Sequence, residues 1–280
     1  MGAAVAACAA STGTRVLWCP AGRSEATVRR AAEAGLEPAA DLGGLLERAE
    51  VVLSLCPPAA AEDVAREVAE FGFTGVYVEG NAISPDRVCR IGDLVGRSAR
   101  AVLDGSVIGS PPAGGKRTRL FLSGPSDATA LLTAMFGGTA VSTAVLGGEI
   151  GQASALKVSY SAYQKASRVL AALSYGLAQH HGVDQALLDV ASKRSGSYLV
   201  ETDYIAKTAS RAWRWAPELE EAADTLRAAG LPDETLRAVA GTLRRWADAK
   251  DDGALSVEGS LEMLRSSGPY GKGKSVRPPT

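Results

Sequence analysis

Short apolar runs alternate with amphipathic stretches over the first half of the chain. The apolar runs, typical of buried strands, lie at 15–19, 51–56, 75–79, 100–104 and 118–122. Charged and apolar residues recur with helical spacing between them, at 24–33 and 61–68. Strands that alternate with helices predict a parallel sheet with helices on both faces. We therefore expect an α/β domain over residues 1–146.

The second half of the chain has a different pattern. After about Gly147 the strand-like runs vanish, and helical periodicity continues to about Leu264. The first long helix is expected to end near His180, because Gly182 follows and glycine commonly ends helices. This pattern predicts an all-α domain over 147–265. The remaining residues, 266–280, are rich in Gly, Pro and Lys and predict a disordered tail.

Composition narrows the possible partners and location. With 280 residues, 46% hydrophobic content and a net charge of -1, the chain is expected to be a soluble protein of two domains. It lacks the clustered Lys and Arg that nucleic-acid binding needs, and it has no apolar run that could span a membrane. The four cysteines show no metal-binding spacing and are interpreted as small buried residues in a reducing compartment, so we predict a cytoplasmic protein without a metal site.

A lone lysine follows a glycine-containing segment at the start of the long helix. Gly148, Gly151 and Ala153 are small residues at near-helical spacing before Lys157. Missing side chains allow a backbone or a ligand to approach closely. Two interpretations are open: a kinked helix start with a solvated lysine, or a catalytic lysine.

The lysine segment, placed where an α/β half meets a helical half, resembles the β-hydroxyacid dehydrogenase superfamily, which includes 6-phosphogluconate and 3-hydroxyisobutyrate dehydrogenases. The family pattern Gly-x-x-Gly-x-Gly-x-x-x-Lys is met by Gly148, Gly151 and Lys157, with Ala153 at the third glycine. The helical half is most similar to a branch of phosphogluconate-dehydrogenase-like NAD(P)-binding oxidoreductases with a C-terminal domain of unknown function. The stretches that carry this closer likeness are 109–112, 153–157, 217–221 and 229–232.

The resemblance implies a Rossmann-like first domain whose first strand is missing. Gly2 corresponds to the last small residue of the glycine fingerprint that binds the cofactor pyrophosphate, and the strand that precedes this fingerprint has no counterpart here. The loss of a central strand would leave two unpaired edges in the sheet. We expect the natural start to lie upstream of Met1.

The resemblance and the local chemistry together predict the cofactor contacts. Arg23 and Ser24 follow the strand at 15–19, and no acid occurs until Glu25, which favours the 2′-phosphate of NADP over the ribose of NAD. Three residues at the end of the strand at 51–56 are expected to lie against the nicotinamide ribose: Leu55, Cys56 and Pro57. Asn81 is expected to bind the cofactor carboxamide or the substrate.

Substrate contacts are predicted less directly. Gly109 and Ser110 weakly match a family stretch that touches the substrate, and Ser161 stands where the family has a substrate-binding asparagine. Ile108 replaces a serine that binds a carboxylate in the family. These departures favour a substrate that is bulkier or less like a carboxylate.

The resulting hypothesis is an NADP-dependent oxidoreductase that transfers a hydride between nicotinamide and a hydroxy or oxo compound, with Lys157 as the general acid and base. Two alternatives are an imine-reductase-like enzyme, against which the lysine argues, and a non-catalytic nucleotide-binding or scaffold protein. The partners implied are a small-molecule substrate and a second copy of the chain, bound through the helical domain.

Overall fold

The computed structural model describes residues 1–193, 196 and 198–266, and the predicted tail lies outside these residues apart from Ser266. The chain divides into two compact units, residues 1–164 and 165–280. The long helix α7 (Gln152–His180) begins in the first unit and ends in the second. It ends at the predicted place, before Gly182 with its positive φ of 68°.

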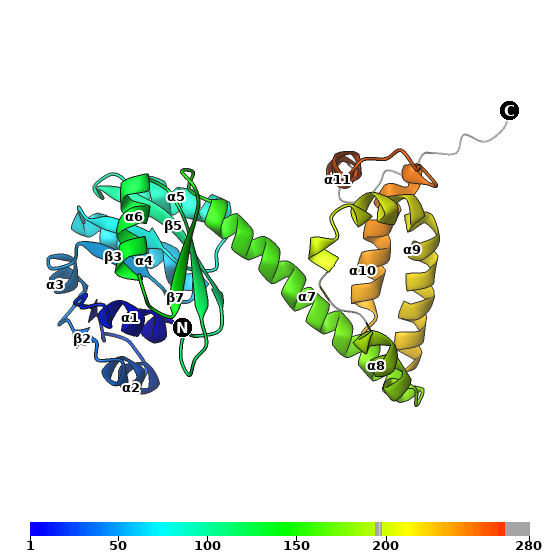
Figure 1. Cartoon of the computed structure of the whole chain (residues 1–280), viewed down its shortest axis with the longest axis horizontal. Helices are drawn as coiled ribbons and strands as arrows, with labels where there is room; N and C mark the ends of the chain where they lie inside the picture. The colour runs from blue at the N-terminus through cyan, green and yellow to red at the C-terminus, as the bar shows by residue number, and fades with distance from the viewer. Residues whose placement is uncertain (194–195, 197, 267–280) are drawn as a thin grey trace. The chain divides into compact units, whose positions relative to one another are not determined.

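A five-stranded sheet forms the centre of the first unit (Figure 1). Its strands lie in chain order: β3 (Val51–Ser54), β4 (Val76–Glu79), β5 (Ala101–Gly109), β6 (Thr118–Ser123) and β7 (Val141–Gly147). β3, β4 and β5 are parallel, but β6 runs antiparallel to β5. The prediction of a parallel sheet was therefore wrong for the pairing of β5 with β6. The segment between β5 and β6 is too short for the crossover that parallel strands require, and it turns through Gly114 and Gly115, both with positive φ.

The first two strands stand apart from this sheet. β1 (Leu17–Trp18) and β2 (Glu37–Pro38) pair in parallel as a separate two-stranded sheet. Among the described residues, β1 does not pair with β3, and α1 (Gly2–Ala10) comes before both in the chain. The expectation of a natural start upstream of Met1 stays a prediction.

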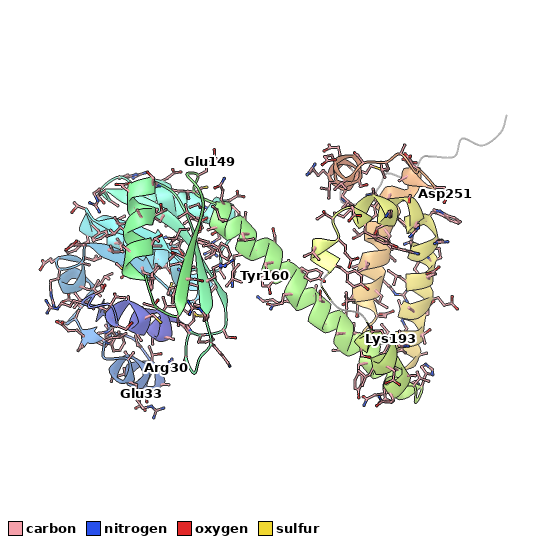
Figure 2. All side chains as sticks on the ribbon, viewed as in Figure 1. Arg30, Glu33, Glu149, Tyr160, Lys193 and Asp251 are labelled. Carbon is pink, nitrogen blue, oxygen red and sulfur yellow. The ribbon has the colours of Figure 1, made fainter. Side chains whose placement is uncertain are left out.

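Helices cover both faces of the five-stranded sheet and bury one apolar cluster on each (Figure 1). On one face, α1 and α6 (Ser126–Met135) pack against alternate strand residues such as Val78 and Leu120. On the other, α3 (Leu42–Leu46), α4 (Ala61–Phe71) and α5 (Pro85–Val95) pack around Tyr77. A separate helix, α2 (Glu25–Glu33), follows β1 and carries Arg30 and Glu33 (Figure 2). The α/β prediction for this half is confirmed.

The second unit is helical throughout its described residues, as the sequence predicts. Its elements are α8 (Asp184–Ser192), η2 (Tyr198–Val200), α9 (Tyr204–Ala228), α10 (Glu234–Leu243), η3 (Arg244–Ala249) and α11 (Val257–Ser266). Alanines on one side of α9, including Ala209 and Ala212, pack against Trp246, whose indole donates to the Ser260 carbonyl at 2.8 Å.

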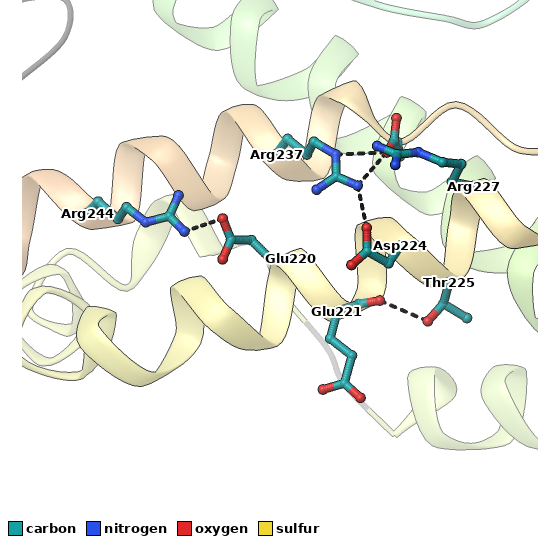
Figure 3. Close-up of polar contacts among 8 residues, drawn as sticks. Glu220, Glu221, Asp224, Thr225, Arg227, Arg237 and Arg244 are labelled. Atoms are coloured by element: carbon teal, nitrogen blue, oxygen red, sulfur yellow. Dashed lines mark hydrogen bonds and ion pairs between the residues drawn. The ribbon is translucent and has the colours of Figure 1, made fainter.

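Ion pairs join α9 to the α10 region at the surface (Figure 3). Arg237 bonds Asp224 at 2.6 Å and Asp233 at 2.7 Å, and Arg244 pairs with Glu220. The pairs of Arg237 with Asp224 and of Arg244 with Glu220 are exposed and add little stability, whereas Asp233 is only 8% exposed.

Two further expectations can be compared with the structure. Cys89 is exposed, and Cys8, Cys19 and Cys56 are only partly buried, which corrects the prediction that the four cysteines are buried. Cys89 follows Val88, whose side chain takes the core-facing position on α5. Across the described residues, none of the helices combines the length and the apolar character needed to cross a bilayer.

Candidate functional site

A row of buried polar side chains crosses the sheet at the last residues of β3, β4 and β6 and in the middle of β5. Ser54, Glu79, Asp104 and Ser123 are paired in register on four successive strands, and each is at most 5% exposed. Residues paired in register point to the same face of a sheet. The carboxyl ends of parallel strands are where open α/β sheets bind ligands, so this row lies at the edge where a site is expected.

Asp104 attaches the start of α7 to this row. Its Oδ2 accepts hydrogen bonds from the Gly151 amide at 3.0 Å and the Ser154 amide at 2.9 Å, and its Oδ1 accepts from Ser154 Oγ at 2.7 Å. Ser123 Oγ donates to Asp104 at 3.4 Å and accepts from the Ala153 amide at 3.3 Å. A carboxylate here satisfies amides that a helix leaves unpaired and interacts favourably with the helix dipole.

The local sequence explains how this attachment forms. Gly151 has a φ of 105°, which side-chain-bearing residues rarely adopt, and it packs against Pro85. Ala153 is fully buried, so its small side chain allows the helix to begin directly against the sheet. Gly148, by contrast, faces open space. Of the three small residues, only Gly151 and Ala153 thus allow the close approach of neighbouring groups that the sequence predicts.

Lys157 lies one turn after Ser154 on α7. Its ammonium Nζ donates to the Val107 carbonyl of β5 at 2.7 Å, and the side chain is half-buried. In Figure 2, Glu149 marks the loop before this helix and Tyr160 marks the turn after the lysine. Because the helix start is bonded to Asp104 and the ammonium to Val107, Lys157 has a defined position against the end of β5.

A cavity of about 220 Å³ lies beside Lys157. Its lining brings together residues from α1, the ends of β3 and β4, β5 and α7: Met1, Gly2, Leu55, Cys56, Pro58, Gly80, Asn81, Ala82, Ser106, Val107 and Lys157. This volume is below the ~300–1,000 Å³ of pockets that enclose drug-sized ligands, so it suits one ring or a small carbonyl compound.

The cavity gathers five of the residues singled out from the sequence: Gly2, Leu55, Cys56, Asn81 and Lys157. Six others are not part of its lining: Arg23, Ser24, Pro57, Gly109, Ser110 and Ser161. Pro58 takes the place expected for Pro57. Arg23 and Ser24 are exposed at the start of α2, Gly109 and Ser110 are exposed at the end of β5, and Ser161 is half-buried on α7. Their ligand contacts stay predictions.

Asn81 ties the cavity wall together. Its Nδ2 donates to Ser54 Oγ at 3.0 Å, its Oδ1 accepts from the Cys56 amide at 2.6 Å, and its own amide donates to Glu79 Oε1 at 3.0 Å. The residue is 3% exposed. The Asn81 side chain, which the sequence predicts to bind a ligand, therefore has a structural role: it holds the loop after β3 against the loop after β4.

Two titratable groups in this wall have shifted pKa values. Burial raises the pKa of the Glu79 carboxyl, the charge of Asp104 acts in the same direction, and the bonds from Asn81 and Tyr77 oppose it. Burial also raises the pKa of the Cys56 thiol, and the interaction with the Ser54 hydroxyl opposes this rise.

The N-terminus of α1 lies at the cavity. Gly2 and Met1 line the cavity, Met1 provides no side-chain cap, and the first turn carries no acidic residue. Helix N-terminal amides without such caps are suited to phosphate groups. No cluster of three or more metal-ligating side chains occurs in the part of the chain that the structure describes.

Sequence reasoning missed the structural roles of Glu79, Asp104, Ser123 and Ser154, and it overlooked Ser106. The signal in the sequence was an acid at the end of an apolar strand, as at Glu79 after Val76–Val78. Acids are rarely fully buried without hydrogen-bond partners, so an acid in a buried strand indicates that such partners exist. The identity of those partners is not visible in the local pattern.

Replacement of Asp104 by Ala should destabilise the protein by about 3 kcal/mol, because several buried donors lose their acceptor together. The exposed Asp127, in the first turn of α6, provides a control variant, Asp127→Ala, with a much smaller expected loss. Urea unfolding followed by circular dichroism measures both. Equal losses in the two variants would contradict the role given to Asp104.

Replacement of Glu79 by Gln should remove a pH dependence of stability. The pKa of Glu79 is raised above its ordinary value of 4.5, so above that pH the folded state retains a proton that the unfolded state has released. Wild-type stability should fall as pH rises through the window above 4.5, and the Gln variant should lack this component. Melting temperatures between pH 4 and 8 test this, with the exposed Glu67→Gln as control. Parallel curves for Glu79→Gln and wild type would refute it.

Comparisons with known proteins agree with this architecture. The model of a domain of unknown function, DUF1932, matches residues 178–246. An uncharacterized 28.5 kDa protein of Methanothermus fervidus is 26% identical over 183 residues, which cover 65% of this chain and 69% of that protein.

Among solved structures, a Streptomyces aurantiacus imine reductase is 23% identical with a TM-score of 0.73, covering 94% of this chain and 95% of that one. An Aspergillus terreus reductive aminase, in complex with NADPH and ethyl levulinate, is 17% identical with a TM-score of 0.72 over 95% and 96% of the two chains. A conserved protein of unknown function, described as structurally similar to 3-hydroxyacid dehydrogenases, is 24% identical with a TM-score of 0.56 over 88% and 94%.

These matches agree with the fold expected from the sequence: residues 178–246 match the DUF1932 model, and the chain has the fold of the 3-hydroxyacid dehydrogenase-like and imine reductase structures, an α/β unit followed by a helical one.

Proposed function

We propose that the protein is an NADP-dependent oxidoreductase that transfers a hydride between nicotinamide and a hydroxy or oxo compound, with Lys157 as the general acid and base. The observation that carries this proposal is the ammonium of Lys157, held by the Val107 carbonyl beside a cavity at the carboxyl ends of the strands. The NADPH complex of a reductive aminase with the same fold supports the cofactor class.

The residues around the cavity fit such a cofactor, because an uncapped helix N-terminus and a cation lie on the side where phosphates are expected. Gly2 and the first turn of α1 would hold the pyrophosphate. Arg23 and Ser24, at the start of α2, would hold a 2′-phosphate. Leu55, Cys56 and Asn81 would flank the nicotinamide. The bound cofactor would supply or accept the hydride.

Lys157 would move the accompanying proton. In reduction, its ammonium would donate to the carbonyl oxygen as negative charge develops there; in oxidation, the amine would accept the proton of the hydroxyl. The bond to Val107 fixes where this proton is presented, and Asp104 fixes the helix that carries the lysine.

A second candidate is reduction of an imine in the same cavity. It is favoured by TM-scores of 0.73 and 0.72 with an imine reductase and a reductive aminase, against 0.56 with the 3-hydroxyacid dehydrogenase-like structure. The proposed proton donor, Lys157, favours the hydroxy and oxo chemistry. We also propose self-association through the helical unit, where Val190, Tyr198 and Val200 are 69%, 64% and 78% exposed.

Replacement of Lys157 by Ala should lower kcat by about a hundredfold or more while NADPH affinity changes little, because a general acid acts on the chemical step. Turnover on a panel of ketones, hydroxy compounds and imines, together with NADPH titration by fluorescence, separates the two effects. The exposed Lys165→Ala on the same helix is the matched control. NADPH binding without turnover on the whole panel would favour a non-catalytic role, and failure to bind any nicotinamide cofactor would overturn both enzyme proposals.

Replacement of Arg23 by Ala should weaken NADPH binding about tenfold to a hundredfold and leave NADH binding nearly unchanged, since a charged hydrogen bond to the 2′-phosphate is lost. Titration of both cofactors measures this ratio. Arg29→Ala removes an exposed charge from α2, the helix that follows Arg23, and serves as control. Equal weakening with both cofactors would argue against a 2′-phosphate contact at Arg23.

A further inference from the structure

Ser106 carries a buried hydroxyl without a hydrogen-bond partner among the described residues. It lies on β5, is 1% exposed and lines the cavity beside Lys157. The nearby buried hydroxyls of Ser54, Ser123 and Ser154 all have partners. Native proteins pair nearly all such groups, because an unpaired one gives up its bonds to water without compensation.

The position of Ser106 relates it to the proposed proton donor. It directly precedes Val107, whose carbonyl accepts from Lys157 Nζ. It follows Asp104 by two residues and so points to the same face of β5 as the anchor of α7. A serine side chain has three staggered positions, and its hydroxyl both donates and accepts. Since Ser106 lines the cavity, rotation about χ1 can present this hydroxyl to a ligand.

We infer that Ser106 is a substrate-binding residue whose hydroxyl hydrogen-bonds a second polar atom of the substrate, next to the oxygen served by Lys157. This inference rests on the proposed function and specifies its substrate class. The only Lys or Arg in the described lining is Lys157, which the reacting oxygen engages. A neutral hydroxyl then suits a neutral second group, such as the hydroxyl of a hydroxyketone, better than a carboxylate.

The test compares two ketones that differ by one hydroxyl, 3-hydroxybutan-2-one and butan-2-one. Their binding to the full chain in the presence of NADPH is titrated by NMR for wild type and Ser106→Ala. The variant should lose about tenfold in affinity for 3-hydroxybutan-2-one and bind butan-2-one as before, because one hydrogen bond to the ligand is lost. Its melting temperature without ligand should equal or exceed that of wild type, since an unpaired buried hydroxyl has been removed.

Ser98→Ala is the matched control, because Ser98 has an equally buried and unpartnered Oγ but does not line the cavity. It should leave both affinities unchanged. Equal affinity of Ser106→Ala and wild type for 3-hydroxybutan-2-one would overturn the inference, as would equal loss for both ketones or a wild-type protein that does not bind 3-hydroxybutan-2-one. A further outcome separates the two proposals. If Ser106→Ala selectively loses affinity for 3-hydroxybutan-2-one but the wild-type protein does not oxidise NADPH with this ketone, the binding role of Ser106 is upheld and the proposed function alone is overturned.

Discussion

The bonds between Asp104 and the first turn of α7 are the interaction on which the rest of the site depends. A buried carboxylate on β5 accepts from two backbone amides and one hydroxyl at the start of the helix. The contact places a full negative charge where the helix dipole is positive, and so the burial of the charge is compensated. Lys157 follows one turn later on the same helix, and its ammonium donates to the Val107 carbonyl of β5. The lysine is thus held at both its backbone and its charged end.

The wall opposite the lysine depends on a second buried carboxyl. Glu79 accepts from the amide of Asn81, and the Asn81 side chain bonds both Ser54 and the Cys56 amide. Burial raises the pKa of Glu79, and the charge of Asp104 on the neighbouring strand adds to the rise. The two acids therefore differ in their contacts: Asp104 bonds the first turn of a helix, whereas Glu79 lies in surroundings that favour its protonated form.

This polar row lies at the edge of the sheet where a ligand site is expected in an open α/β fold. Tyr77 and Val102 lie on the same face closer to the beginnings of the strands and pack into the apolar cluster under α4 and α5. Ser54 and Glu79 are the last residues of β3 and β4, whereas β5 continues past Asp104 to Gly109. The apolar cluster and the polar row therefore occupy different parts of the same strands. Ser106, which lines the cavity and whose buried hydroxyl has no partner among the described residues, lies beyond the row on β5.

The sequence by itself determined the α/β half, the helical half, most strands and the helix that carries Lys157, because periodicity reports burial and local hydrogen bonding. It also identified five residues that line one cavity, through their places after strands and at a helix start. Only the tertiary structure decided the antiparallel direction of β6, the separation of β1 and β2 from the main sheet, and the partners of Asp104 and Glu79. Asp104 and Ser154 are 50 residues apart, and no local pattern encodes such a contact. The unpaired hydroxyl of Ser106 is likewise visible only after every neighbour has been placed, because satisfaction of a hydrogen bond is a property of the folded surroundings.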